Sequence, residues 1–312
     1  MKIALATHML RGYPTVVGHL PTLGERQALF SWAKRRGFAG IEVGDWWLDF
    51  YHASIDELVG VKRELASHGL ELTGFNCLRK CVTHPAVAEQ NRRDLRRAVE
   101  VASAVSPTIV SISLSLSPEA SGTPDDRVRG LEVSPGGSSQ ATDAEFAAAA
   151  SFLREIAELG AAAGVQVAVE LHHCSLADTS QTLLRLLDLA NHPNLSANPD
   201  LGNLYWAYAI PEEPWHKAVE RLAGRVRIWH VKNVQRVHVP EVGRSFFTHA
   251  ALDLGDIDYR WALARLVAAG FDGPISIEGA GPGDLLAFAA RGKAYLDDLL
   301  DTLASGDGLG VQ

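Results

Sequence analysis

The sequence predicts a single-domain α/β protein, a closed (β/α)8 TIM barrel, and three observations support this prediction. Eight segments with strand-like character alternate with eight segments of helical character. The chain has 312 residues, somewhat more than the roughly 250 residues that such a barrel typically uses. Polar residues stand at the ends of several predicted strands, where a barrel mouth would collect them. An open, doubly wound sheet is the alternative, and it is disfavoured because no GxGxxG follows the first strand.

The individual elements follow from local signals along the chain. Capping boxes at Thr22, Ser54 and Thr142, each with a glutamate three residues later, mark the starts of helices. Alternating apolar residues and β-branched residues mark the strands, most clearly in VQVAVE and PTIVSISLSLS. Strands are expected at residues 2–8, 38–45, 70–77, 107–117, 165–170, 195–200, 225–233 and 274–279. Helices are expected at residues 22–37, 54–69, 85–105, 142–160, 182–190, 211–224, 258–270 and 284–303.

Two segments fit neither pattern and are expected to be long loops within one domain spanning residues 1–312. Residues 117–141 are dense in proline, glycine and serine. Because they follow the fourth strand, they should emerge at the barrel face formed by the carboxyl ends of the strands, where a loop of this length is often a lid or binding loop. Disorder is the alternative for this segment. The second long loop is expected at residues 234–253, after the seventh strand.

Charge and composition limit the class of partner. The formal net charge is -8, so no bulk attraction to nucleic acid or to an anionic membrane is expected. No apolar run is long enough to span a bilayer, and the N-terminus lacks the form of a signal peptide, so a cytoplasmic protein is expected. Neither nucleic acid nor a membrane is therefore expected as a partner, and a homo-oligomer is left open.

Four strands end in, or carry, side chains that bind metals. The fifth strand ends in Glu170, the sixth in Asp200 and the eighth in Glu278, while the seventh carries His230. Their inward parity at one end of the barrel makes these four side chains converge. Three carboxylates and one imidazole in a small volume favour a bound cation. A hard or borderline divalent ion such as Mn²⁺, Mg²⁺, Co²⁺ or Zn²⁺ is expected.

The motifs GFAGIEV, AVELHH, NPDLGNL, RIWHVKN, LGDIDYRWAL and GFDGPISIEG occur in this order along the chain. With them the chain resembles the sugar phosphate isomerase/epimerase superfamily, the xylose-isomerase-like TIM barrels. This superfamily includes ketose 3-epimerases, hydroxypyruvate isomerase, inosose dehydratase and endonuclease IV. The resemblance implies one catalytic metal ion held by Glu170, Asp200, His230 and Glu278. It also implies that Glu170 and Glu278 are the catalytic acid and base on opposite faces of a keto sugar.

The chemistry expected of such a site passes through an enediolate. A metal ion that polarises a substrate carbonyl makes the adjacent C–H acidic enough for a carboxylate to remove its proton. An isomerase or epimerase of a small unphosphorylated keto sugar or related polyol is the leading expectation. A lyase or dehydratase of an inosose-type keto-cyclitol or a 3-keto-glycoside is the alternative, and a non-catalytic sugar-binding barrel is a third. A phosphorylated substrate is not supported, because no glycine-rich anion nest opens a helix.

Further polar residues are expected near this site. His172 shares the strand parity of Glu170 and is assigned to substrate binding, as is Lys232, for which an ion pair with a neighbouring acid is the alternative. Asn203 is also assigned to substrate binding. It stands where endonuclease IV and many ketose 3-epimerases carry histidine, and this departure, with the negative net charge, argues against a nuclease. Glu42 and His8, at the ends of the first two strands, are candidates for the rim.

Overall fold

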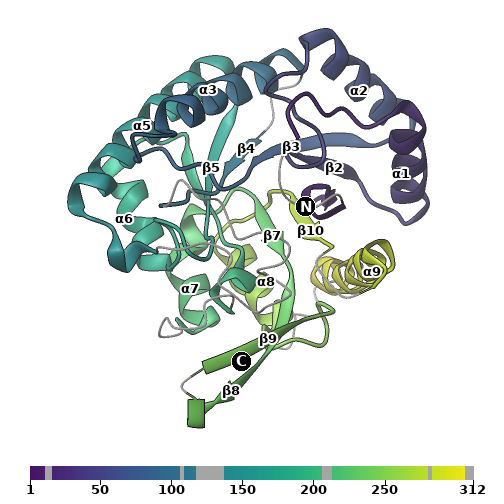
Figure 1. The fold of residues 1–312 in the computed structure, drawn as a ribbon. Helices are drawn as coiled ribbons and strands as arrows, with labels where there is room; N and C mark the ends of the chain where they lie inside the picture. Colours follow the sequence, from purple (N-terminus) through teal and green to yellow (C-terminus); the bar gives the residue numbers. More distant parts are fainter. Residues whose placement is uncertain are drawn as a thin grey trace.

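Eight parallel strands form the wall of a barrel, as the alternation of strand and helix predicted, and helices surround it (Figure 1). The computed structural model describes residues 1–10, 16–105, 109–116, 137–205, 213–242, 244–279 and 283–305. The barrel strands are β1 (Ile3–Ala6), β2 (Gly40–Gly44), β3 (Glu71–Cys77), β4 (Ile109–Ile112), β5 (Gln166–Glu170), β6 (Leu195–Asn198), β7 (Trp229–Val231) and β10 (Ile275–Glu278). The helices around them in the described ranges are α1 (Leu23–Arg35), α2 (Ile55–Ser67), α3 (Ala88–Val105), α5 (Asp143–Ala163), α6 (Ser180–Ala190), α7 (Trp215–Leu222), α8 (Tyr259–Ala268) and α9 (Leu285–Ala304).

The strands follow the order β6-β5-β4-β3-β2-β1-β10-β7, with every neighbouring pair parallel. Strands β6 and β7 close the ring without a backbone ladder between them in the described residues. A single parallel bridge joins Ala197 to Val226 at this seam. The side chain of Asn198 adds a second connection, because its Oδ1 accepts a hydrogen bond of 2.9 Å from the backbone N–H of His230.

The capping signals of the sequence correspond to real helix starts. Thr22, Ser54 and Thr142 each accept a hydrogen bond from the backbone N–H three residues on, and the glutamate there bonds back to the cap. Helix α5 ends at Ala163 and is capped by Gly164, whose φ of 71° lies in the left-handed region that glycine adopts without strain. Local hydrogen bonding therefore fixes where these helices begin and end.

Polar side chains occupy many inward-facing positions of the barrel strands, beside a small buried apolar cluster of Ile109, Ala168 and Ile228. Asn198 of β6 donates a hydrogen bond of 2.9 Å to Ser111 of β4, across the intervening strand β5. Glu42 of β2 and His230 of β7 are fully buried and in contact, although their strands are not neighbours. The aliphatic core lies instead between the strands and the helices. Buried polar groups of this kind are costly unless they are paired, so their presence points to a site.

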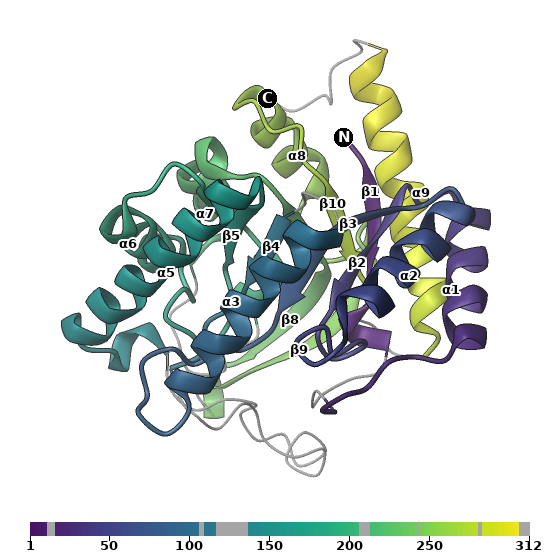
Figure 2. The ribbon, with the colours of Figure 1, turned by 90° about the horizontal axis from the view of Figure 1, so that it is seen from above.

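The segment expected as a second long loop has regular structure. Strands β8 (Asn233–Val239) and β9 (Arg244–Ala250) form an antiparallel two-stranded ribbon, so the expectation of an irregular loop at residues 234–253 is corrected. β-Branched and aromatic residues in both strands favour this pairing. Figure 2 shows the ribbon toward one end of the barrel, with the start of β1 and the end of α9 at the other.

The first expected loop, residues 117–141, lies largely outside the described residues. Its final part contains a short 3-10 helix, Ser138–Gln140. None of the helices in the described ranges is long and apolar enough to cross a membrane.

Candidate metal centre

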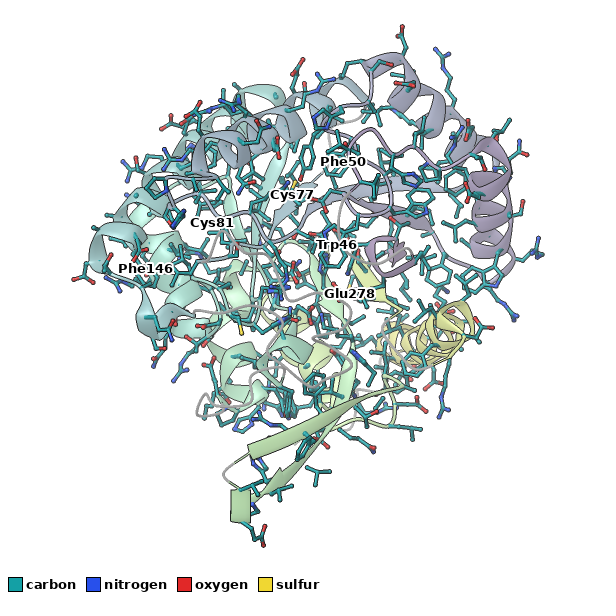
Figure 3. All side chains as sticks on the ribbon, in the orientation of Figure 1. Trp46, Phe50, Cys77, Cys81, Phe146 and Glu278 are labelled. Carbon is teal, nitrogen blue, oxygen red and sulfur yellow. The ribbon has the colours of Figure 1, made fainter. Side chains whose placement is uncertain are left out.

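Four side chains from separate strands meet at the carboxyl ends of the barrel strands. Glu170 is the last residue of β5, Glu278 is the last residue of β10, His230 lies within β7, and Asp200 follows β6. Each is buried and offers one ligand atom, and these four atoms all lie within 4.8 Å of one another. Figure 3 places Glu278 near the centre of the view along the barrel. The structure therefore brings together the four residues that the sequence predicted to converge.

The imidazole of His230 is oriented by carboxylates on both of its nitrogens. Its Nδ1 lies 3.1 Å from Oε1 of Glu278 and 3.9 Å from Oε1 of Glu170. Its Nε2 lies 2.9 Å from Oε1 of Glu42. Burial alone would lower the pKa of His230, but the carboxylates of Glu42, Glu170 and Glu278 raise it well above its usual value. Nδ1 is thus the ring nitrogen that faces the cluster.

Lys232 occupies the same cluster as a buried cation. Its Nζ lies 2.5 Å from Oδ2 of Asp200 and 2.6 Å from Oε2 of Glu278. Burial would lower the pKa of this ammonium, but Asp200 and Glu278 outweigh burial and raise it. Glycine at position 202 leaves room for the Lys232 side chain, since a Cβ there would lie 2.6 Å from Cγ of Lys232. The ion pair weighed as the alternative for Lys232 is therefore present.

Two residues assigned only to the rim belong to the cluster itself. His8, in the 3-10 helix after β1, has its Nε2 3.2 Å from Oε1 of Glu278. Gly44 allows this approach, because a Cβ there would lie 2.4 Å from the Cβ of His8. Glu42 is fully buried on the far side of His230. Their position at strand ends was the available sequence signal, but contacts across the barrel have no local signature.

The carboxylates differ in their environments. Burial raises the pKa of Asp200 well above its usual value despite the charge of Lys232. Burial would also raise the pKa of Glu278, but Lys232, His8 and His230 lower it well below the usual range. For Glu170, burial is likewise opposed by the neighbouring His230, with His172 adding to the effect, and the pKa is lowered. At neutral pH both glutamates are therefore carboxylates.

Asn203 and His172 complete the group predicted from the sequence. Asn203, in the 3-10 helix Leu201–Tyr205, places its Nδ2 3.1 Å from Oε1 of Glu170 and 2.9 Å from Oδ2 of Asp200. His172 donates from Nδ1 to the carbonyl of His173 at 2.9 Å, so its Nε2 is left as an acceptor. Burial and, secondly, Arg79 lower the pKa of His172 to about 3, and the ring is neutral at pH 7.

The donor set fits a divalent cation. Within the described part of the chain, Oε2 of Glu170 is buried and has no hydrogen-bond partner, and Nδ1 of His230 is buried and faces the carboxylates of Glu170 and Glu278. A cation at this place would bind Oε2, which otherwise carries the cost of an unpaired buried polar group, and the lone pair of Nδ1 in the deprotonated ring. Three carboxylates with one imidazole suit Mn²⁺, Mg²⁺ or Zn²⁺ better than a soft ion.

Two buried residues beside the cluster were not identified from the sequence. His173 contacts Asn203, and Arg79 contacts His173 across 94 positions of the chain. The doublet of histidines after the fifth strand was a signal for His173. No sequence signal pointed to Arg79, because its contribution depends on the conformation of the loop after β3.

Comparison with known proteins is consistent with this geometry. The family model described as xylose isomerase-like TIM barrel matches residues 30–303 of the chain. No curated protein matches the sequence.

Among solved structures, a xylose isomerase-like TIM barrel protein from Mycobacterium smegmatis, in complex with magnesium, is 21% identical over 96% of this chain and 97% of its own, with a TM-score of 0.82. An L-ribulose 3-epimerase is 17% identical over 100% and 98% of the two chains, with a TM-score of 0.71. The probable 3-DHS dehydratase AsbF from Bacillus anthracis is 19% identical over 95% and 99%, with a TM-score of 0.66. At these identities the likeness shows a shared fold.

Proposed function

The chain belongs to the xylose isomerase-like TIM barrel family, and from this premise we propose that it is a divalent-metal-dependent sugar isomerase or epimerase. The proposed substrate is a small unphosphorylated keto sugar or related polyol. The observation that carries the proposal is the convergence of one ligand atom each from Glu170, Asp200, His230 and Glu278 within 4.8 Å. We propose these residues as the ligands of one ion, with Mn²⁺ first among Mn²⁺, Mg²⁺, Co²⁺ and Zn²⁺.

The two glutamates would move the proton. When bound, the metal polarises the substrate carbonyl and makes the neighbouring C–H acidic. Glu170 and Glu278 come from β5 and β10, which are separated by β6 and β7 around the barrel, so they approach a bound substrate from different sides. Their lowered pKa values keep both as carboxylates, the form that accepts a proton. One would remove a proton to give the enediolate and would itself become a carboxylic acid, which can return that proton to the adjacent carbon. Delivery to the opposite face would come from the other glutamate after it has taken up a proton from solvent.

The neighbouring polar residues would orient the substrate. His172 is neutral and presents Nε2 as an acceptor, which suits a substrate hydroxyl. Lys232 donates hydrogen bonds and carries a positive charge, which suits an oxygen that becomes negative in the enediolate. Asn203, expected from the sequence to bind substrate, directs its amide hydrogens at the carboxylates of Glu170 and Asp200 instead of into open space.

A lyase or dehydratase acting on a keto-cyclitol or a 3-keto-glycoside is the second candidate. It shares the enediolate but needs an acid to protonate the departing oxygen. His8, with its Nε2 3.2 Å from Oε1 of Glu278, is a further proton carrier next to the reacting groups. This contact is the reason to keep the dehydratase reaction as a candidate.

Proton exchange with solvent tests the proposal. The Mn²⁺-loaded protein would be incubated in D₂O with a panel of keto sugars and inososes, and NMR would follow both deuterium incorporation and new products. Chelated protein and Glu170→Gln serve as controls. We expect exchange at the carbon next to the carbonyl of at least one sugar, with an epimer or isomer as product. If sugars bind without any deuterium exchange, the protein is a non-catalytic sugar-binding barrel. If the product has lost water, the dehydratase reaction is the correct one.

A further inference from the structure

A chain of hydrogen bonds runs from a buried arginine to two of the proposed metal ligands. Nη2 of Arg79 lies 2.5 Å from Nε2 of His173. Nδ1 of His173 lies 3.2 Å from Oδ1 of Asn203. Nδ2 of Asn203 in turn lies 3.1 Å from Oε1 of Glu170 and 2.9 Å from Oδ2 of Asp200. All five side chains are buried.

The arginine fixes the direction of every hydrogen bond in this chain. A guanidinium has only donors, so Nε2 of His173 has to accept and cannot carry a proton. The single N–H of the neutral ring is then on Nδ1. That N–H needs an acceptor, and the atom of Asn203 opposite it must be the oxygen Oδ1. Arg79, at one end of the chain, thus requires the same orientation of the Asn203 amide that the acceptor oxygens of Glu170 and Leu171 require at the other end.

The orientation of the amide decides how the carboxylates are held. With Oδ1 toward His173, the NH₂ group of Asn203 donates to Glu170, to Asp200 and, at 2.9 Å, to the carbonyl of Leu171. The reverse orientation would direct an amide oxygen at two carboxylates, which are acceptors only. Oε1 of Glu170 is occupied by this contact, and Oε2 is left for a cation.

The backbone of Arg79 adopts a left-handed conformation that two neighbouring serine side chains stabilise. Its φ of 52° is a left-handed conformation that is uncommon for a residue with a side chain. Two serines that follow β4 stabilise it. Ser113 accepts a hydrogen bond of 2.8 Å from the N–H of Arg79, and the hydroxyl of Ser115 donates to its carbonyl at 3.1 Å. Backbone strain that is maintained in this way is typical of functional sites.

We propose that Arg79 and His173 are positioning residues that hold the Asn203 amide in place and, through it, the carboxylate oxygens of Glu170 and Asp200. The inference rests on the proposed function in taking these two carboxylates as metal ligands. It gives Asn203 a role in holding the ligands in place of direct contact with the substrate. Residues that orient metal ligands typically change metal affinity about 10- to 100-fold when they are altered.

Two measurements on protein without substrate test this proposal. The first is ¹⁵N NMR of the histidine rings in metal-free wild-type protein, where His173 is expected as the Nδ1–H tautomer. The second is calorimetric titration of metal-free protein with Mn²⁺. Arg79→Met removes the donors at similar length, and it is expected to increase the share of the Nε2–H tautomer of His173 and to weaken Mn²⁺ binding about 10- to 100-fold. Arg79→Lys keeps a group that can only donate and should restore most of both.

The control is Arg154→Met, which removes an arginine that bonds the carbonyls of Leu189 and Ala190 at the end of α6, away from the cluster. It should leave the tautomer and the Mn²⁺ affinity unchanged. A wild-type His173 with its proton on Nε2 would overturn the proposal, and so would Arg79→Met protein that binds Mn²⁺ as tightly as wild type. If wild-type protein bound no divalent ion, the proposed function would fail, while the tautomer would still decide whether the chain has the direction assigned to it.

Discussion

Nε2 of His230 lies 2.9 Å from Oε1 of Glu42, although 188 positions separate the two residues in the sequence. An imidazole that donates from Nε2 to a carboxylate keeps the lone pair of Nδ1 for a cation. Glu42 therefore determines which nitrogen of His230 faces Glu170 and Glu278. Both residues of the pair are fully buried, so solvent does not weaken their interaction.

Glu42→Gln tests this pairing. Glutamine keeps the shape and an acceptor oxygen but loses the charge that makes His230 a stronger base. We expect the dissociation constant for Mn²⁺ to rise about 10- to 100-fold, as measured by calorimetry. Glu71→Gln, which alters an exposed carboxylate paired with Lys2, is the matched control and should leave the affinity unchanged. Equal affinities of Glu42→Gln and wild type would show that Glu42 does not tune the ligand.

Glu278→Gln and Glu170→Gln test the division of proton transfer between the two glutamates. At saturating metal, each substitution is expected to lower kcat by roughly 10²–10⁴, because a carboxamide cannot accept the proton. In an epimerase each variant should still exchange a proton with one epimer while it fails to interconvert the two. Deuterium incorporation into each epimer, followed by NMR, is the measurement. A wild-type rate for metal-saturated Glu278→Gln would leave Glu278 as a ligand alone.

Lys232→Met tests the role of the buried ammonium in the metal-free protein. Removal of Lys232 leaves Asp200 and Glu278 buried without the cation that lies between them. We expect the free energy of unfolding of the metal-free protein to fall by about 3–5 kcal/mol, the usual cost of breaking a buried ion pair. Excess Mn²⁺ should recover much of this loss, as measured by urea denaturation with and without the ion.

Lys2→Met is the control for this experiment, because Lys2 and its partner Glu71 are both exposed. Its effect should stay within about 1 kcal/mol. A loss for Lys232→Met that is equally small would mean that the two acids adjust without the ammonium, for example by taking up a proton on Asp200.

The pH dependence of metal stabilisation follows from His230. Its pKa is raised well above the ordinary value, which is about 6.5. In metal-free protein the protonated ring stabilises the folded state fully below that ordinary value, and this contribution is lost as pH rises through the raised pKa. A bound cation needs the ring deprotonated, so protons compete with the metal on the acid side. We expect the difference in Tm between Mn²⁺-loaded and metal-free protein to increase as pH rises above about 6.5.

Thermal unfolding at several pH values, with and without Mn²⁺, measures this difference. His52→Gln, which removes a half-exposed histidine that pairs with Asp49, should not change the trend. A Tm difference that does not vary with pH would mean that His230 binds no metal.

Much of the fold and the four converging residues could be predicted because their signals are local. Strand alternation fixes the inward direction of Glu170 and Glu278, and capping boxes fix the helix starts. Parallel strands then bring the ends together without further information. The ribbon β8–β9 was missed because the long interval between strand and helix was interpreted as irregular, although valines at positions 234, 237 and 239 carry β propensity.

The contacts that could not be predicted join segments far apart in the sequence. Glu42 and His8 were placed at the rim because strand position alone does not show how deeply a side chain reaches. Arg79 reaches His173 only because two serines hold its backbone in a left-handed conformation. A positive φ outside glycine has no composition signal, so this part of the site depends on the three-dimensional structure.

The seam between β6 and β7 is the place where the barrel wall has the fewest backbone hydrogen bonds in the described residues. Asp200 follows one of these strands and His230 lies in the other, and the described residues show no backbone ladder joining them. An ion bound by both Asp200 and His230 would therefore link β6 to β7, where the described residues show no backbone ladder. Amide protons near this seam should exchange with solvent fastest in metal-free protein and slow most when the ion binds. Amide exchange rates measured residue by residue would thus show whether the barrel opens locally between β6 and β7.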